Sequence, residues 1–532
     1  MREAHSPPER STHASPSPRR WAALLCLCGG PVLVVLDTTM ISLALPSIGR
    51  GLSAGTAALQ TMVDAYVIAF AGLMVSIGSL ADRWGRRRMV ISGLMVMSAA
   101  SVGATWGLSI WWVAFMRAVM GMGAAMVVPA TVALLMAEFP ARERPRAFAV
   151  WAAVAAVALT VGPLVGGGLV SLFGWRGVFW VNVPVAVVAA VATLRHVRES
   201  AADHYPPSDL LAGLLLTAGL GAGLVALVAA GRPAGGQQAL GVGLVGIAAL
   251  VGFLWRNVRS AGATIDFVLY RAPAFWAGSV AAGIAAFAAS ATLFSLGQYL
   301  QLILGRSALG AGAFLAPMAL GVVVGSVLGA RMARRRGGRI GIGLGFTVAT
   351  LGFVVLTIAS IGVMTVALVC IGLALAGGGV GMAGPSVTTT VLGAVPENRV
   401  VMGAALNSTH QQLGTAAGIA VLGTVEHLVF TARLSQDHPM INTDSLVSAL
   451  AQAGTGTRHE VAVQAAFGVA QAAIMALAAV LCLIAALVAL RYVPSGDGPR
   501  LRGQNTCLCV GWARRRRSGA RAPLRPHKFR CN

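Results

Sequence analysis

The sequence predicts an all-α protein that crosses a membrane fourteen times, and three observations lead to this fold class. The chain has 532 residues, of which 57% are hydrophobic and 11% are charged, whereas soluble domains carry about 25% charged residues. Apolar runs of about 20 residues, long enough to cross the hydrocarbon of a bilayer, recur along the chain. Arginines gather in every second loop between these runs. This composition excludes a soluble globular protein.

Each apolar run predicts one helix, since an α-helix that rises 1.5 Å per residue needs about 20 residues to span the bilayer. Six helices are expected in the first part of the chain, two in the middle and six in the last part. The expected spans are 22–45, 61–81, 89–108, 110–137, 148–172, 178–194, 210–230, 239–256, 274–303, 309–330, 340–360, 362–392, 401–423 and 462–491.

The arginines predict the orientation. An even number of spans places both termini on one side, and the positive-inside rule makes that side cytoplasmic. The net charge of +23 therefore indicates membrane topology rather than nucleic-acid binding. Loops on the side of the termini carry Arg83, Arg86, Arg87, Arg88, Arg142, Arg144, Arg146, Arg195, Arg198, Arg256, Arg259, Arg271, Arg331, Arg334, Arg335, Arg336, Arg339 and Arg399. The opposite short loops carry Arg50, Arg176, Arg232 and Arg306.

The second half of the chain repeats a feature of the first. Gly78-Ser79 precede the arginines of 83–88, and Gly325-Ser326 precede those of 331–339 in the same way. Two related six-helix bundles are therefore expected, with substrate bound where they meet. The expected regions are a cytoplasmic tail (1–21), a six-helix bundle (22–198), an extra helix pair (199–262), a second bundle (263–495) with a long external loop (424–461), and a basic, disordered cytoplasmic tail (496–532).

Two acids and one arginine stand inside predicted spans. Asp37 lies in the first span and Asp64 in the outer part of the second. An acid at membrane depth is a functional hypothesis by default, and burial favours its neutral form, which suits a reversible proton carrier. The alternative for each is a hydrogen-bonded structural acid. Arg117 in the fourth span needs an acidic or carbonyl partner, which could be Asp37 or another acid. We assign these three residues to proton or cation coupling.

The loop after the second span combines an acid, several arginines and two glycines. Anchoring of the topology alone would account for its positive charge. The glycines also permit a close helix approach and a tight turn, and an acid beside arginines forms a breakable cluster that can bias one of two global states. We assign conformational gating to Gly78, Asp82, Arg83, Gly85, Arg86 and Arg87.

The fifth span contains small residues spaced by four beside a proline, a pattern that permits tight packing and bends a helix. Its hinge residues are expected to be Gly162, Pro163, Gly166 and Gly167, and glycines within 377–381 are expected to soften the twelfth span similarly. Candidate cavity residues are Tyr66, Gln298, Tyr299, Gln301, Asn407, His410 and Gln411. For a lone membrane histidine such as His410, a packing role is the alternative.

Neither a nucleotide site nor an enzyme active site is expected. Lys528, in the basic tail, is the only lysine, and a phosphate-binding P-loop requires a lysine after its glycines. The scattered histidines and cysteines form no catalytic constellation, and Cys507-Leu508-Cys509 lacks a second pair of metal ligands. We therefore expect no cofactor and no metal. Active transport would depend on an ion gradient, unless a separate subunit supplies ATP.

Several motifs follow one another in a fixed order. Gly78 to Arg88 fits G-x-L-a-D-r-x-G-r-r/k, Leu36 to Pro46 resembles L-D-x-T-i-v-n-v-A-L-P, and Arg117 to Gly123 matches R-x-x-x-G-x-G. Gly162 to Gly167 matches G-P-x-x-G-G, and Trp175 to Pro184 resembles W-R-w-i-F-x-i-N-v-P. Over about 22–492 the chain resembles the 14-helix drug:proton antiporter branch of the major facilitator superfamily. It departs from the usual family residues at Met62, Met120, Ala158 and His410.

This resemblance implies the major facilitator fold and proton-coupled export, by alternating access, of drugs, antibiotics or other amphiphilic and cationic compounds. It makes Asp37 the leading proton or cation site. The alternative is a narrow exporter of a natural product or metabolite of the host; the fifth-span motif weighs against an uptake carrier. The expected partners are the small-molecule substrate, protons and the lipid bilayer, without nucleic acid. The expected form is a monomer in the cell membrane.

Overall fold

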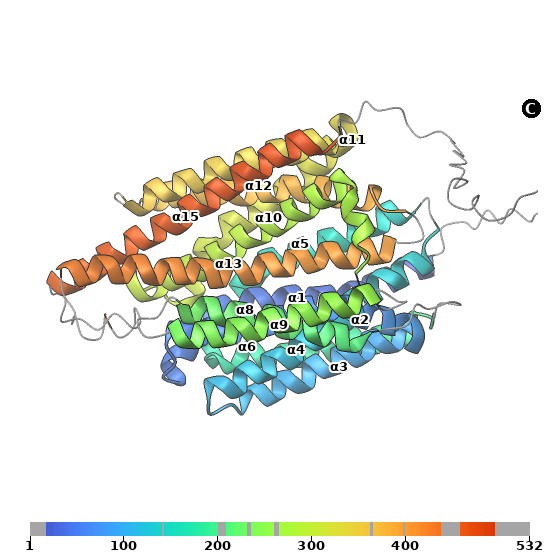
Figure 1. The fold of residues 1–532 in the computed structure, drawn as a ribbon, viewed down its shortest axis with the longest axis horizontal. Helices are drawn as coiled ribbons and strands as arrows, with labels where there is room; N and C mark the ends of the chain where they lie inside the picture. The colour runs from blue at the N-terminus through green and yellow to red at the C-terminus, as the bar shows by residue number, and fades with distance from the viewer. Residues whose placement is uncertain are drawn as a thin grey trace, which may run out of the picture. The chain divides into compact units, whose positions relative to one another are not determined.

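The computed structural model describes residues 18–140, 143–200, 209–230, 236–259, 265–361, 365–396, 400–437, 449 and 458–494. These residues form helices joined by turns, without a strand among them (Figure 1). The expected tail 496–532 and most of the expected tail 1–21 lie outside the described residues, as do Arg142, Arg232 and Arg399.

Every expected span coincides with a helix. The first group comprises α1 (Pro18–Gly51), α2 (Thr56–Trp84), α3 (Arg86–Thr105), α4 (Ile110–Glu138), α5 (Arg144–Phe173), α6 (Arg176–Trp180) and α7 (Asn182–His196), of which the last two form one span. The middle pair is α8 (Leu210–Ala230) and α9 (Gly236–Arg259). The last group comprises η1 (Phe267–Arg271), α10 (Pro273–Gln298), η2 (Tyr299–Ile303), α11 (Ala308–Ile361), α12 (Val366–Gly393), α13 (Val400–Asp437) and α15 (Arg458–Tyr492).

The expected number of spans is reached by counting α5 and both limbs of α11. Among the described residues, 12 helices are long and apolar enough to cross a membrane, and α5 contributes a shorter apolar stretch. The 54-residue α11 counts twice, because Gly337 interrupts it with φ 79° and ψ 168°. That left-handed conformation suits glycine, which has no Cβ to clash. The arginine cluster 331–339 therefore surrounds a turn, as expected.

Glycines pack α12 between the two limbs of α11. A Cβ at Gly325, in the first limb, would overlap the carbonyl oxygen of Gly378, and a Cβ at Gly345, in the second limb, would lie 2.7 Å from the backbone nitrogen of Ala383. Small residues let helix backbones approach within a membrane, where packing rather than the hydrophobic effect holds helices together. The glycines of 377–381 lie within an uninterrupted α12 and take part in this contact, whereas their softening of the helix stays a prediction.

The two six-helix groups touch each other near one end of the bundle. The helix α5 packs on α1 and on the first limb of α11, and α13 packs on α2. A Cβ at Gly167 would lie 2.5 Å from the carbonyl oxygen of Ala308, and Gln301 donates a hydrogen bond of 3.1 Å to the carbonyl oxygen of Leu43. All four residues lie toward the end of the bundle where α1 ends and α11 begins.

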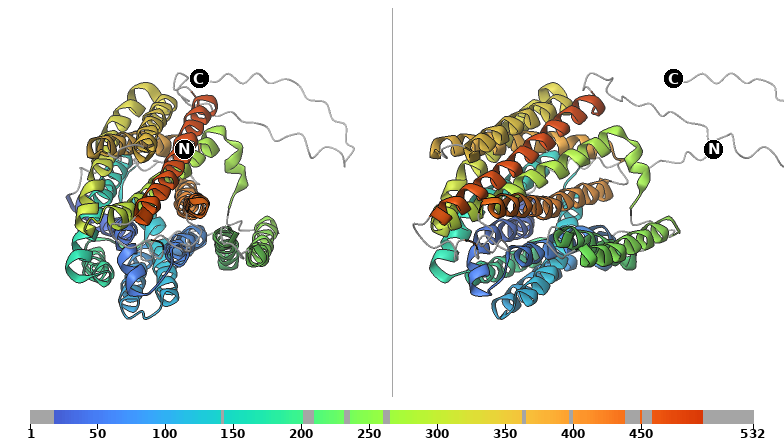
Figure 2. Two further views of the ribbon diagram at one scale, coloured as in Figure 1. Left: turned by 90° about the vertical axis from the view of Figure 1, so that its left-hand side faces the viewer. Right: turned by 60° about the vertical axis from the view of Figure 1, so that its left-hand side comes forward.

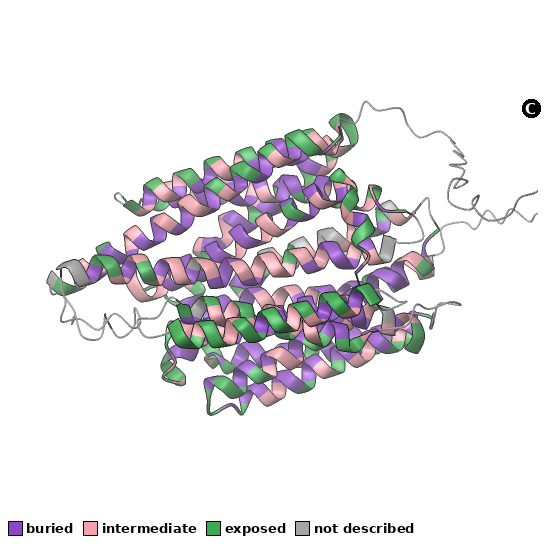
Figure 3. Cartoon of the chain, viewed as in Figure 1, coloured by how far each residue is buried: buried purple, intermediate pink, exposed green. Residues whose placement is uncertain are grey.

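The extra pair α8–α9 is central in the sequence but lies at the side of the bundle, where α8 packs on α2 and α13 and α9 packs on α8 (Figure 2). Exposed residues dominate α9 (Figure 3). Asp209 lies just before α8 and accepts a 2.8 Å hydrogen bond from Arg256 near the end of α9. Burial tends to raise the pKa of Asp209, but the bonds from Arg256 and the Ala212 amide outweigh this and hold it below its usual value.

The expected external loop 424–461 begins later than the sequence suggested. Residues 424–437 belong to α13, and α15 begins at Arg458. This segment is polar overall, but one face of it is buried. Phe430 and Leu434 on that face pack against Val463 and Phe467 of α15. Tertiary packing thus extends the helix beyond its apolar run.

We predict that Gly377→Ala destabilises the protein by about 1–3 kcal/mol, the usual result of overpacking a core, because its Cβ would overlap the carbonyl oxygen of Met318. The matched control is Gly384→Ala on the same helix, where a Cβ meets nothing within 4 Å. Thermal unfolding of the two purified variants in detergent measures the difference. Equal melting temperatures would contradict the packing role.

Candidate functional site

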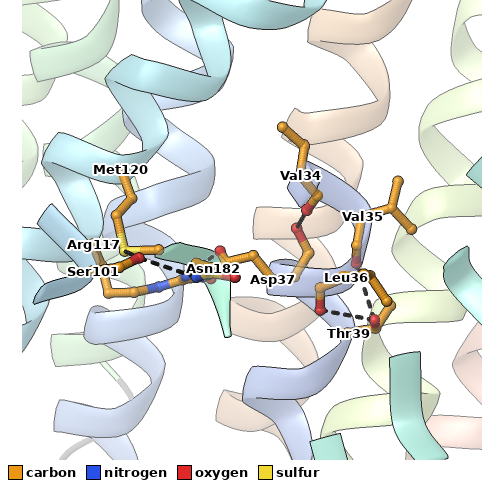
Figure 4. A network of polar contacts seen from close by, with 10 residues as sticks. Val34, Val35, Leu36, Asp37, Thr39, Ser101, Arg117, Met120 and Asn182 are labelled. Atoms are coloured by element: carbon orange, nitrogen blue, oxygen red, sulfur yellow. Dashed lines mark hydrogen bonds and ion pairs between the residues drawn. The ribbon is translucent and has the colours of Figure 1, made fainter. Parts of the chain in front are cut away.

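A buried ion pair joins two of the three predicted coupling residues. Asp37 of α1 and Arg117 of α4 are both 0% exposed, and Nη1 of Arg117 donates a hydrogen bond to Oδ2 of Asp37 (Figure 4). Of the partners left open by the sequence, the structure therefore selects Asp37. Each charge neutralises the other in an environment where an isolated charge is very costly.

Asn182, at the beginning of α7, holds the other side of the carboxylate. Its Nδ2 donates a hydrogen bond of 2.8 Å to Oδ1 of Asp37 and one of 3.1 Å to the hydroxyl of Ser101 in α3 (Figure 4). The amide has two hydrogens, so both bonds can form together. Asp37 is thus anchored by α4 and α7, with α3 behind it.

Tyr66 of α2 completes the surroundings of Arg117. The guanidinium carbon lies 4.3 Å from the centroid of the Tyr66 ring, a cation–π contact. Nε and Nη2 of Arg117 have no hydrogen-bond partner among the described residues. The arginine therefore retains donor capacity that the present arrangement does not use. Tyr66 was expected in a cavity but is fully buried in this contact.

Asp64 lies apart from this pair. It is 3% exposed, and its Oδ1 has no hydrogen-bond partner within the described part of the chain. One helical turn before it, the side chain of Gln60 lies against Gly423 of α13, where a Cβ would overlap the Gln60 amide. Asp64 therefore lies one turn from a contact between the two six-helix groups.

The predicted gating loop is held by the segment that follows α7. Arg86 donates a 2.8 Å hydrogen bond to Asp82, as the expected charge cluster requires. Glu199 accepts hydrogen bonds from the backbone amides of Arg87 and Arg88, of 2.9 and 3.2 Å. The N-cap of α3 is Gly85, which has no capping side chain, so Glu199 supplies the missing acceptor.

The remaining gating residues take different positions. Gly85 has φ 106°, and a Cβ there would lie 2.9 Å from the carboxyl carbon of Glu199. A Cβ at Gly78 would make only an ordinary contact with Pro129 of α4, so the close helix approach expected there does not require a glycine. Arg83 is exposed. The tight turn at Gly85 was expected; the role of Glu199 was not.

The predicted hinge residues lie where α5 meets two other helices. A Cβ at Gly162 would overlap the Thr39 hydroxyl, and one at Gly166 would lie 2.8 Å from Cα of Met40. Gly167 faces Ala308 of α11, and Gly312 of α11 faces the carbonyl oxygen of Pro163. The motif thus allows α5 to contact both six-helix groups, whereas its movement as a hinge stays a prediction.

The remaining candidate cavity residues do not converge on one site. Gln298 and Asn407 are buried, Gln411 is exposed, Gln301 bonds to α1, and Tyr299 stacks on Phe467. Nε2 of His410 lies 3.0 Å from the Tyr270 hydroxyl, and the histidine borders a shallow, open, apolar depression with residues of α10 and α15. The contact with Tyr270 fits a packing role for His410, and the cavity role stays a prediction.

Three comparisons with known proteins bear on this arrangement. The family model of the major facilitator superfamily matches residues 27–419. The chain belongs to the major facilitator superfamily. It is 32% identical over 400 residues to multidrug resistance protein Stp of Mycobacterium tuberculosis, covering 74% of each chain. It is 28% identical over 434 residues to the tetracenomycin C resistance and export protein of Streptomyces glaucescens, covering 80% of this chain and 79% of that one.

A solved structure shows the same fold. This is the crystal structure of a bacterial homologue of the human lysosomal transporter Spinster in an inward-facing, unoccupied conformation. The TM-score is 0.64 at 17% identity, with 91% of this chain and 100% of that chain covered. The superfamily protein described here is therefore a multi-pass transporter of small molecules, not an enzyme. Among its described residues, no group of three or more His, Cys, Asp or Glu is arranged to hold a metal.

Sequence reasoning missed Asn182, Ser101 and Glu199 as members of the site. Asn182 belongs to the motif Trp175 to Pro184, so the sequence marked its position, but it gave no indication of what the side chain does. Ser101 and Glu199 carried none, because a serine in a span and an acid after a span are common. Only the packing of this transporter's α3 and α7 shows their partners.

We predict that Arg117→Met destabilises the transporter by about 3–5 kcal/mol, because it leaves Asp37 buried and unpaired. The double variant Asp37→Asn, Arg117→Met should recover part of this loss. Thermal unfolding in detergent measures both, with Arg433→Met as the control for removing an exposed arginine. A double variant less stable than the single variant would contradict the pairing.

We also predict that Glu199→Ala weakens the start of α3 by about 1 kcal/mol, the usual effect of losing a cap. Amide hydrogen exchange in peptides covering 86–90 should then accelerate roughly fivefold. Glu143→Ala is the control, because one of its carboxylate oxygens has no hydrogen-bond partner in the described residues. Unchanged exchange in Glu199→Ala would refute the capping role.

Proposed function

We propose that the protein is a proton-coupled exporter of drugs, antibiotics or other amphiphilic and cationic compounds in a bacterial cytoplasmic membrane. The observation that carries this proposal is the ion pair between Asp37 and Arg117, both fully buried. Binding of one proton to Asp37 would leave the charge of Arg117 without its neutralising partner. A proton gradient can drive transport only if proton binding changes the relative energies of the protein's conformations, and a buried acid beside a charge is a group that can do this.

Protonation of Asp37 would change the pair directly. A neutral carboxyl group attracts the guanidinium less strongly than a carboxylate does. Arg117 would then turn its unused donors, Nε and Nη2, toward other acceptors. Since the pair joins α1 to α4, loading and release of the proton would alter the packing of these helices. Asp64 is the second buried acid among the described residues of this half and lies near α13.

The arrangement of the halves supports alternating access. With both termini cytoplasmic, as the arginines predict, the end where α5 meets α11 and Gln301 meets Leu43 is the external end. In the proposed cycle, contact between the halves at this end belongs to the states in which the external side is closed.

The substrate class rests on the relatives. One is named for multidrug resistance and another for resistance to and export of tetracenomycin C. The second name favours the alternative that this protein exports a single natural product of its host. Because Gln411 is a polar side chain exposed within a span, it favours an aqueous substrate path beside α13. No cofactor is needed for either function.

We predict that cells producing the protein expel ethidium, and that an uncoupler abolishes this efflux. Asp37→Asn should lower the rate at least about tenfold, a coupling loss of about 1.4 kcal/mol or more. Asp64→Asn should have the same direction of effect. Fluorescence of loaded cells measures efflux, and Glu138→Gln at the end of α4 is the control for removing an acid outside the buried sites.

Efflux that persists after the uncoupler would contradict proton coupling. If correctly inserted wild-type protein expels no ethidium, the broad cationic substrate range is wrong, and the narrow exporter becomes the favoured function. Loss of efflux in Glu138→Gln as well would show that the readout does not separate coupling from folding.

A further inference from the structure

A second buried carboxyl group lies in the C-terminal half, on the part of α13 that the sequence assigned to a loop. Glu426 is 6% exposed. The Ser295 hydroxyl of α10 lies 2.8 Å from Oε2 of Glu426 and 2.6 Å from Oε1 of Gln471 in α15. Ser295 and Gln471 are each 1% exposed. Three helices therefore meet at one buried polar cluster.

The packing of α10 on α13 sets the position of Glu426. The two residues Ser295 and Glu426 are separated by 131 positions. The same separation relates Gly283 to Gly414, where a Cβ on the second would overlap the carbonyl of the first, and Phe287 to Gly418, which are also in contact. The two helices thus run parallel in one register, and this register brings Glu426 to Ser295.

Among the described residues, Glu426 belongs to no ion pair. Asp37, by contrast, is paired with Arg117. A carboxylate buried without a cation costs far more than a neutral carboxylic acid, so such a group takes up a proton. The environment therefore favours the protonated form of Glu426.

A count of hydrogens allows two arrangements, and the protonated one fits the Gln471 amide as it is oriented here. A serine hydroxyl has one hydrogen, so Ser295 cannot donate to both Glu426 and Gln471. If Glu426 is protonated, its hydroxyl donates to Ser295, and Ser295 donates to Oε1 of Gln471. Both short distances are then satisfied. If Glu426 is a carboxylate, the Gln471 amide must turn so that its nitrogen faces Ser295.

Three aromatic rings cover the cluster on one side. Tyr299 lies one turn after Ser295, Phe430 one turn after Glu426, and Phe467 one turn before Gln471. Phe467 stacks on Tyr299 at 5.8 Å between ring centroids and meets Phe430 edge-on at 6.3 Å. These rings lie on the side of the cluster that faces the end of the bundle at which the two halves touch.

We propose that Glu426 is a second proton-binding site of the transporter, which holds a proton in this conformation and exchanges it during transport. The role in transport rests on the proposed proton coupling. In the release step the O–H bond of the carboxylic acid breaks, the proton passes to water, and a carboxylate remains. Uptake of a proton from water after the conformational change restores the acid.

Other titratable or charged residues lie on the helices around Glu426. They are Asp64 on α2, Tyr299 at the end of α10, His427 and Arg433 on α13, and His459 and Glu460 on α15. Glu426 forms its described hydrogen bond with Ser295 and with none of these. A contact between α13 and α2, that of Gly423 with Gln60, lies one turn from each of the two acids Glu426 and Asp64.

Infrared spectroscopy of the purified protein tests the bound proton directly. At neutral pH the wild type should show the carbonyl stretch of a protonated carboxylic acid that is reduced in Glu426→Gln. Asp64→Asn is measured alongside to identify the contribution of Asp64. Glu460→Gln, which removes an acid at the start of α15, should leave the band unchanged. An unchanged band in Glu426→Gln would overturn the proposal and favour the turned Gln471 amide.

Transport in proteoliposomes tests the use of the proton. Glu426→Gln should retain exchange of labelled ethidium between the two sides but lose at least about tenfold of the uphill transport driven by a pH gradient. Equal gradient-driven transport in wild type and Glu426→Gln would overturn the role in transport. If the wild type itself shows exchange without gradient-driven transport, the proposed function fails, while the infrared result on Glu426 still stands by itself.

Discussion

The cost of a charge in a low-dielectric interior governs this structure. Asp37 and Arg117 are fully buried, and each is tolerable only because the other is present. Their pairing joins α1 to α4, and Asn182 and Ser101 extend it to α7 and α3. One electrostatic requirement therefore links four helices of the first half. In the proposed function, a proton on Asp37 would weaken this contact.

Outside the buried ion pair, close packing of helix backbones holds the helices together. Lipid offers no hydrophobic driving force between helices, so contact depends on shape. Glycines bring α12 against both limbs of α11, and they let α5 reach α1 and α11 at the same level. Where α5 meets α11, the contact between halves is made by small residues, and beside it Gln301 donates a hydrogen bond to the carbonyl oxygen of Leu43.

The acids Asp64 and Glu426 give the two halves a common feature. Neither has an ion pair among the described residues, and each lies one turn from the contact of Gln60 with Gly423. Movement of α13 against α2 would change the surroundings of both. The bound proton and the contact between halves are thus close enough to influence each other, which is what coupling of an ion gradient to a conformational change requires.

The sequence by itself determined the helices, their order and the candidate acids Asp37 and Asp64, because the bilayer demands long apolar runs and makes any acid within them conspicuous. It also indicated the turn at Gly85 and the break among the arginines of 331–339. Only the tertiary structure decided that Arg117 pairs with Asp37, that Glu199 caps α3 and that Glu426 is buried. Each of these depends on side chains far apart in the chain, and local composition carries no information about which helices will meet. Glu426 was misplaced for that reason, since the buried face of α13 beyond its apolar run exists only when α10 and α15 pack against it.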